Sequence, residues 1–290
     1  MACLSFSSAA SFLSLRLATF SAPFVAPLRR CRLWLSAYAL MLALPIANAA
    51  PNGPDCSRPL TLGLHIHGLL YSSQTGAGID KDVTDAMAQR SGCTINTTVL
   101  PRARIWQLIE SGALDFSLSG IATPERDRFA AFAWYFSNKY YLLVRQDSGV
   151  EKVADFESKP ALQLGVIRSF RYGARTNQWV DQLAEAGRVS YASDLEPLYQ
   201  VLQLGRIHGM IIEPFDMMDV QGTPVKSVTR IIELDDPAIP HGLIMSKKSL
   251  SVAEQAKWRA VIDGMRQDGT VQRIFEKYFS PELARSMVNF

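Results

Sequence analysis

Long runs of one charge and long apolar runs are both scarce in this sequence. Its 290 residues contain no extended stretch of lysine and arginine and no basic helix face, which argues against nucleic acid or an anionic membrane as a partner. After residue 49 no apolar stretch is long enough to cross a membrane. No small-residue lipobox precedes Cys56, whose neighbours are Pro54 and Asp55, and this argues against a lipid anchor.

Recognisable catalytic and metal-binding sets are also missing. No nucleophile is visibly paired with a base, and this disfavours an enzyme. His65 and His67 are two positions apart on an expected strand and therefore share one face. A transition-metal site needs three or more protein ligands, and the sequence places no third one beside them. We therefore predict no metal, no cofactor and no catalytic residue, and we interpret His65 as a cleft-lining group.

The N-terminus is typical of a secretory signal peptide. Three arginines at positions 29 to 32 precede the apolar run 33–46, and Ala47, Asn48 and Ala49 are small residues that a signal peptidase accepts. We expect the leader to be removed after residue 49 and the protein to be periplasmic. Because the leader contains four arginines and no acid, its removal lowers the formal charge from +3 to about −1.

Two cysteines remain after the leader. Cys56 and Cys93 each precede an expected strand, and these two strands would be neighbours in one parallel sheet. An oxidising compartment permits them to pair. We predict a disulfide between them; two buried free thiols are the alternative.

Two stretches of the chain have nearly the same form. Residues 108–119 and 201–212 each read as an apolar helix end, a glycine stop and a mostly apolar strand. This repetition predicts two similar α/β lobes. The first strand leads to Arg126 and the second to Glu213, and ligands of open α/β sheets bind at such strand ends. The sequence therefore predicts a cleft that binds a small charged molecule from both sides.

The order of the expected elements indicates that one lobe interrupts the other. We predict an α/β fold in which each lobe is a mixed, mostly parallel sheet flanked by helices, with two strands forming a hinge. The expected parts are a signal peptide at 1–49, the first lobe at 50–145, the second lobe at 146–243, and a return to the first lobe at 244–290. Expected strands lie at 60–66, 94–99, 114–119, 140–145, 162–167, 189–192, 209–212, 230–234 and 243–246. Expected helices include those at 102–111, 124–129, 194–204 and 252–267.

Other conspicuous residues are interpreted as structural. Arg102 and Trp106 belong to an expected helix at 102–111, and arginines near a helix start are often solvated. Asp80 is a natural N-cap for the helix that follows Gly78. The aromatic cluster at 134–141 is expected to belong mainly to the lobe core.

Five ordered motifs resemble one known family. They are Gly78-Ile79-Asp80-Lys81-Asp82, Thr123-Pro124-Glu125-Arg126, Phe136-Ser137-Asn138-Lys139-Tyr140, Gly205-Arg206-Ile207-His208, and Asp268-Gly269-Thr270 through Tyr278. Together they resemble family 3 of the periplasmic solute-binding proteins, the amino-acid-binding group of ABC transport systems. The resemblance covers essentially the whole mature chain, and it implies the two-lobed periplasmic-binding-protein fold of type II.

The resemblance also implies roles for single residues. Arg126 matches the position that binds the ligand's α-carboxylate, and Glu213 matches the position that receives its ammonium. From the residues alone, Glu213 could equally cap the helix that begins near Pro214. Further ligand contacts are implied for Ser119, Ile121, Thr123, Ser169 and Phe170.

Four positions depart from the family pattern. His208 replaces an aspartate, Lys139 replaces a turn proline, Phe170 replaces a threonine, and Tyr71 is a poorly aligned substitute for the usual tyrosine. The fold prediction is unaffected by these departures, but they weaken the expectation that the ligand is an ordinary α-amino acid.

The expected function is capture of a small carboxylate-bearing solute by closure of the lobes. The resemblance implies that a monomer delivers this solute to the membrane subunits of an ABC transporter. Two alternatives stay open at this stage. One is a periplasmic enzyme similar to cyclohexadienyl dehydratase, and the other is a ligand sensor for a membrane kinase.

Overall fold

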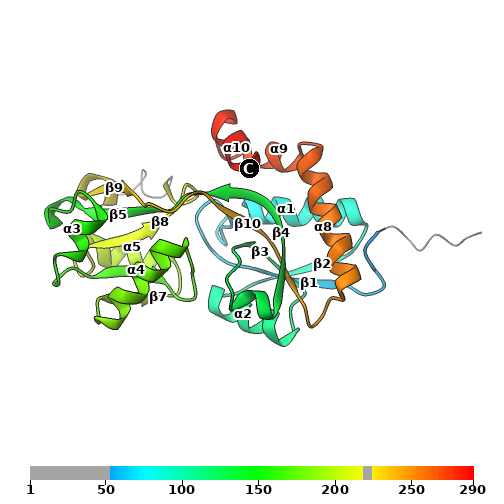
Figure 1. The fold of residues 1–290 in the computed structure, drawn as a ribbon. Helices are drawn as coiled ribbons and strands as arrows, with labels where there is room; N and C mark the ends of the chain where they lie inside the picture. The colour runs from blue at the N-terminus through cyan, green and yellow to red at the C-terminus, as the bar shows by residue number, and fades with distance from the viewer. Residues whose placement is uncertain (1–52, 218–223) are drawn as a thin grey trace, which may run out of the picture. The chain divides into compact units, whose positions relative to one another are not determined.

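Two five-stranded mixed sheets form the framework of the protein (Figure 1). The structure, a computed structural model, describes residues 53–217 and 224–290. The first sheet has the strand order β2-β1-β3-β10-β4 and the second has the order β7-β6-β8-β5-β9. In both sheets the first two pairings are parallel and the last two antiparallel. The predicted fold class is confirmed, whereas the predicted signal peptide lies outside the described residues.

The first lobe contains the first sheet and the helices packed on it. Phe116 of β3 and Trp258 of α8 meet edge to face in its core, with their ring centroids 4.9 Å apart. The strands are β1 (Leu60–Leu64), β2 (Ile95–Val99), β3 (Phe116–Gly120), β4 (Ala130–Asn138) and β10 (Ile239–Ser246). The helices are α1 (Ile79–Ser91), α2 (Arg102–Ser111), α8 (Val252–Gln267), α9 (Thr270–Phe275) and α10 (Pro281–Val288), with a short 3₁₀ turn η1 (Arg126–Arg128).

The second lobe contains the second sheet and shorter helices. Helix α5 buries Leu195, Leu198, Tyr199 and Leu202 on one stripe, as its sequence period predicts. The strands are β5 (Tyr141–Arg145), β6 (Leu164–Ile167), β7 (Val189–Ala192), β8 (Gly209–Ile212) and β9 (Thr229–Glu233). The helices are α3 (Val153–Glu157), α4 (Ala174–Glu185), α5 (Leu195–Gln203) and α7 (Val225–Val228), with a 3₁₀ turn η2 (Gln146–Ser148).

The two similar stretches seen in the sequence occupy matching places in the two lobes. Gly112 ends α2 with φ of 79°, and Gly205 follows α5 with φ of 71°. Only glycine adopts this left-handed backbone at little cost. Each glycine leads into the strand that is central in its sheet, β3 or β8, so the glycine stops are confirmed.

The chain passes between the sheets at two places that differ from the predicted limits. Strand β4 pairs with β10 in the first sheet, while β5 pairs with β8 and β9 in the second. The first crossing therefore lies between Asn138 and Tyr141, before the expected limit at 145. The return lies between Glu233 and Ile239, before the expected limit at 243. The first crossing could not be located from the sequence, because it follows the mostly apolar and aromatic residues of β4 and neither glycine nor proline marks it.

The predicted disulfide is confirmed. Cys56 and Cys93 are 37 positions apart and bonded, with their Cα atoms separated by 4.8 Å. Cys56 precedes β1 and Cys93 precedes β2. The bond therefore links the segments that lead into these two paired strands.

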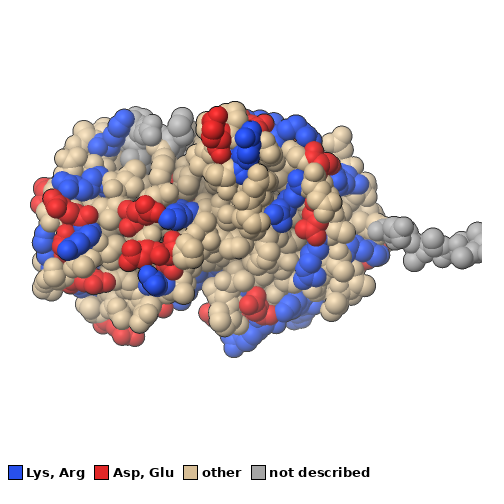
Figure 2. All heavy atoms as spheres, turned by 45° about the horizontal axis from the view of Figure 1, so that its top comes forward, with Lys and Arg blue, Asp and Glu red and all other residues tan. Residues whose placement is uncertain are grey.

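The surface carries charges of both signs. Figure 2 shows lysine and arginine interspersed with aspartate and glutamate on the face in view. Within the described ranges, no helix combines the length and the apolar character that a membrane span requires.

Candidate functional site

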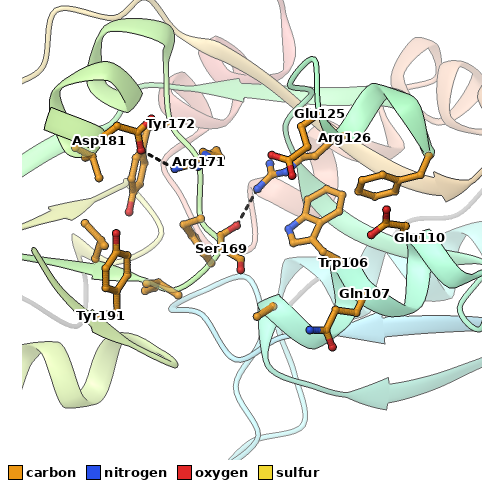
Figure 3. A pocket seen from close by; sticks show the side chains of 16 residues that line it. Trp106, Gln107, Glu110, Glu125, Arg126, Ser169, Arg171, Tyr172, Asp181 and Tyr191 are labelled. Atoms are coloured by element: carbon orange, nitrogen blue, oxygen red, sulfur yellow. Dashed lines mark hydrogen bonds and ion pairs between the residues drawn. The ribbon is translucent and has the colours of Figure 1, made fainter. Parts of the chain in front are cut away.

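Arg126 lies between the lobes, where groups from both contact its guanidinium (Figure 3). The residue begins the turn η1 after β3, and only 7% of it is exposed. Its Nη1 donates to the carbonyl of Ile121 at 3.0 Å, and its Nη2 donates to the carbonyl of Ser169, in the second lobe, at 2.8 Å. The guanidinium stacks on the ring of Trp106 at 4.0 Å. Burial, together with the nearby Arg102, lowers the pKa of Arg126 to about 9, which leaves it cationic at neutral pH.

Two cavities meet at Arg126. The outer cavity has a volume of about 380 Å³ and is open to solvent between the lobes. The inner cavity has a volume of about 10 Å³, enough for about one water molecule. Arg126, Phe170 and Arg171 line both. The outer cavity is completed by aromatic and acidic side chains that include Trp106, Phe129, Tyr172, Tyr191, Glu110, Glu125 and Asp181, and the inner one by residues that include His65, Ser119, Ile121 and Glu213.

Ser119 is fixed beside the inner cavity by two side chains of the first lobe. Its φ is 52°, a left-handed backbone that a non-glycine residue rarely adopts. The Ser119 hydroxyl donates to Asp80 Oδ1 at 2.6 Å, and its backbone N–H donates to the Tyr135 hydroxyl at 3.1 Å. Burial raises the pKa of Asp80 to about 6, although the hydrogen bond from Ser119 opposes the rise.

Asp80 does not cap helix α1, contrary to the sequence-based expectation. Gly78 occupies the N-cap, and Asp80 lies within the first turn. The motif places its carboxylate on the inward face of the helix, where it holds Ser119. An acid near a helix start is favourable in either position, so the local sequence could not distinguish the two.

Arg102 is buried, with only 5% of it exposed, which corrects the expectation of a solvated residue. Its two terminal nitrogens donate to the carbonyls of Leu118 and Ser119, each at 3.0 Å. Its guanidinium lies 5.2 Å from the Trp106 ring centroid. Arg102 and Trp106 are four positions apart and therefore share one face of α2. That spacing, on a helix that follows a strand end, was the available signal for both.

Glu213 lies in the cleft with both carboxylate oxygens engaged. Its Oε1 is 2.7 Å from His67 Nε2, and its Oε2 accepts from Asn138 Nδ2 at 2.9 Å. The side chain that caps the turn after β8 is Asp216, which accepts from the Glu213 N–H at 3.0 Å. Burial alone would lower the pKa of His67, but Asp216 and Glu213 outweigh it and raise the pKa to about 9. The three residues thus form a buried ion-pair cluster.

The donor types of this cluster also suit a metal ion. Among the described residues, His67, Glu213 and Asp216 offer ligand atoms within 4.8 Å of one another. Two ligands about 2.0–2.1 Å from a tetrahedral ion lie more than 3 Å apart. The 2.7 Å between His67 and Glu213 is instead the length of a charge-assisted hydrogen bond. The contact therefore has the geometry of an ion pair.

The remaining predicted site residues divide into two groups. His65 and Ile121 line the inner cavity, and Ser169 and Phe170 reach the cleft from the second lobe. Thr123 accepts from the Arg126 N–H at 3.2 Å and so shapes the turn, but it lines neither cavity. Tyr71 packs against the core of the first lobe and also lines neither.

Two of the departures from the family pattern lie outside the cleft. His208 Nδ1 accepts from the Gln163 N–H at 3.1 Å. Lys139, at the crossing between sheets, pairs with Glu233 of β9. Both substitutions therefore have local partners within the second lobe.

Two lobes, two crossings and a buried arginine between them define a two-lobed ligand-binding protein with the type II periplasmic-binding-protein fold. The sequence matches the bacterial extracellular solute-binding proteins, family 3, over residues 68–281, and the chain belongs to that family. No match was found among curated proteins.

Solved structures share the fold at low sequence identity. An ancestral arginine-binding protein bound to arginine superposes with a TM-score of 0.66 and 21% identity, covering 78% of this chain and 100% of that one. The arginine-, lysine-, histidine-binding protein ArtJ from Geobacillus stearothermophilus gives 0.66 and 20%, covering 77% and 95%. A histidine kinase sensor domain with similarity to periplasmic binding proteins gives 0.65 and 15%, covering 78% and 98%.

Proposed function

We propose that this protein captures a small carboxylate-bearing solute, an amino acid or a related compound, between its lobes in the periplasm. A monomer then delivers the solute to the membrane subunits of an ABC transporter. The predicted leader supports secretion, and family membership supports solute capture. The structural neighbours whose names mention arginine, lysine or histidine support the amino-acid class.

One observation carries the proposal: a buried guanidinium contacted by both lobes forms a wall of a 380 Å³ cavity. Small-molecule sites commonly have volumes of about 300–1,000 Å³. Arginine has five N–H donors, and the contacts among the described residues use two of Arg126's. The others can bind a carboxylate through two parallel hydrogen bonds. Arg126 is thus the proposed carboxylate anchor.

Glu213 keeps the ammonium-receiving role that the family pattern implies, although its carboxylate is already engaged. Its two oxygens already contact His67 and Asn138, so an incoming ammonium must share them. Each oxygen has a second lone pair for this purpose. Ser119, Ile121, Ser169 and Phe170 complete the proposed binding surface around Arg126.

A thermal-shift screen of amino acids, polyamines and small organic acids identifies the solute, and calorimetry then tests the anchor. Arg126→Ala leaves a buried carboxylate unpaired, which costs about 3–5 kcal/mol, or roughly 100-fold or more in affinity. Arg126→Lys also weakens binding, because lysine cannot make the two parallel bonds. Arg128→Ala, an exposed arginine of the same turn, is the matched control and leaves the affinity unchanged. Unchanged affinity in Arg126→Ala would remove this residue from the site.

An enzyme on the same scaffold is the second candidate, and Asp80 is the observation that favours it. A buried carboxyl whose pKa is raised to about 6 is suited to proton transfer near neutral pH. The hydrogen bond that Asp80 accepts from Ser119 equally supports a purely structural role, in which Asp80 holds Ser119 in position. Incubation with prephenate or arogenate decides between the two, because turnover would contradict a purely binding role.

A further inference from the structure

The segment Ser169–Phe170 of the second lobe reaches into the first lobe with a strained backbone. Ser169 has φ of 65°, and Ser119, on the opposite wall of the cleft, is the other non-glycine residue with positive φ in the described chain. Such strain persists where surrounding contacts fix it, and it gathers at ligand sites. The contacts that fix Ser169 and Phe170 are therefore informative.

The carbonyl of Ser169 accepts from Arg126 Nη2 at 2.8 Å. This oxygen takes one of the guanidinium N–H groups that a bound carboxylate could otherwise use. The bond joins the lobes, since Arg126 follows β3 and Ser169 follows β6. The protein thus supplies its own acceptor to the proposed anchor.

The ring of Phe170 lies against three groups of the first lobe. Its centroid is 5.1 Å from the His67 ring, 5.8 Å from the His65 ring and 5.9 Å from the Arg102 guanidinium. We call the space bounded by His65, His67 and Arg102 the ring seat. Because about 10 Å³ remains empty beside it, the Phe170 ring fills most of the seat.

The chemistry of the ring seat favours an aromatic occupant. Arg102 is a buried cation. The carboxylates of Glu213 and Asp216 favour the protonated imidazole of His67, which is a second buried cation. Cations attract the electron-rich face of an aromatic ring, whereas an aliphatic chain offers no such face. A flat ring can also stack on the imidazole of His65.

We propose that Ser169 and Phe170 occupy the ligand's place in the closed cleft, and that the ligand is an aromatic carboxylate whose ring takes the seat of Phe170. This inference rests on the proposed function, since it assigns the ligand's carboxylate to Arg126. The outer cavity provides the space for the displaced ring, because Phe170 lines both cavities and the outer one measures about 380 Å³. Phe170 is then an internal competitor that the ligand must displace.

Calorimetry of the purified protein with four probes tests the ligand class. L-phenylalanine and phenylacetate carry the ring and the carboxylate, L-leucine replaces the ring by an aliphatic chain, and phenylalaninol lacks the carboxylate. We expect at least one aromatic acid to bind about 10-fold or more tightly than leucine, and phenylalaninol to bind about 100-fold more weakly than L-phenylalanine. Equal or tighter binding of leucine, with dependence on Arg126, would overturn the inference and leave the proposed function intact. Failure of every carboxylate probe to bind would overturn the inference, whereas the proposed function would be contradicted only if no carboxylate of the thermal-shift screen bound in a way that depends on Arg126.

Variants of Phe170 test the displacement. Phe170→Ala removes the competitor, so we expect the aromatic acid to bind about 3- to 10-fold more tightly than it binds the wild type. Phe170→Leu keeps the apolar bulk that packs on the second lobe but loses the aromatic face, and it should shift affinity in the same direction. Phe290→Ala, which removes an exposed ring that lines neither cavity, is the control and should leave the affinity unchanged. A 10-fold or greater loss of affinity in both Phe170 variants would show that this ring stacks on the ligand, and would overturn its displacement.

Discussion

Three cationic side chains are buried in one cleft, and each interacts with carboxylates or with backbone carbonyls. Arg126 and Arg102 donate to backbone carbonyls, while His67 pairs with Glu213 and Asp216. Buried charges are retained only where such partners exist. At this scale the sequence predicted Arg126 from its motif. For Arg102 it offered only the spacing of four positions from Trp106, because burial itself depends on how α2 packs over β3.

Asp80 gives a prediction that belongs to a single residue. Its pKa is about 6 in the folded protein and near 3.8 when unfolded, so the unfolded chain releases the proton at lower pH. Wild-type stability therefore decreases as pH rises from about 4 through 6. Asp80→Asn cannot ionise and therefore does not show this loss. Between pH 4 and 7, the free energy of unfolding of the variant should rise relative to that of the wild type by on the order of 1–3 kcal/mol.

Urea unfolding at several pH values measures this shift. Asp85→Asn, an exposed residue of the same helix that pairs with Lys81, is the matched control. A difference between Asp80→Asn and wild type that stays constant with pH would contradict the assigned environment of Asp80.

The elements were largely predictable where a periodic stripe or a glycine stop marks them. Helices α2 and α8 and strands β7 and β8 have the predicted limits. Strand β4 was missed because nine consecutive, mostly apolar residues show no alternation when both faces are buried. The predicted helix at 124–129 is only the turn η1, and α10 was not predicted.

The disulfide provides a prediction at the scale of elements. It closes a loop with a separation of 37 residues, so its removal by Cys56→Ser with Cys93→Ser should lower the free energy of unfolding by about 3–4 kcal/mol. Solute affinity should be unchanged, since the bond lies at the N-terminal ends of the parallel strands β1 and β2, whereas the cleft residues His65, His67 and Ser119 lie at the C-terminal ends of β1 and β3. Urea unfolding and calorimetry of the double variant check both parts. An unchanged unfolding midpoint, or a loss of affinity, would contradict this account.

At the scale of the whole molecule, the cleft depends on links between the lobes. Besides the two crossings, the segment after β8 contacts the first lobe: Phe215 stacks edge to face on Phe136, with centroids 5.3 Å apart. His67 of the first lobe pairs with Glu213 and Asp216 of the same segment. The sequence predicted two lobes from repeated patterns. It could not predict these links, because they join residues about 80 to 150 positions apart and follow no local pattern.

His67 therefore makes stability depend on pH. Its pKa is about 9 in the folded protein and near 6.5 when unfolded, so its contribution is complete below pH 6.5 and is lost as pH rises through 9. His67→Gln leaves two buried carboxylates without their cation and should cost about 3–5 kcal/mol at pH 6. That cost should shrink between pH 7 and 10.

Urea unfolding from pH 6 to 10 follows this change. His241→Gln is the matched control, because burial lowers the pKa of His241 to about 4 and this residue is neutral over the whole range. A cost of His67→Gln that does not vary with pH would show that the imidazole is not charged in the cleft.

The most direct measurement is a crystal structure of the protein with the tightest-binding solute of the screen. The account predicts a solute carboxylate about 2.7–2.9 Å from the Arg126 guanidinium nitrogens, with the lobes closed around it. A solute bound elsewhere, with Arg126 contacting only protein carbonyls, would contradict the central claim.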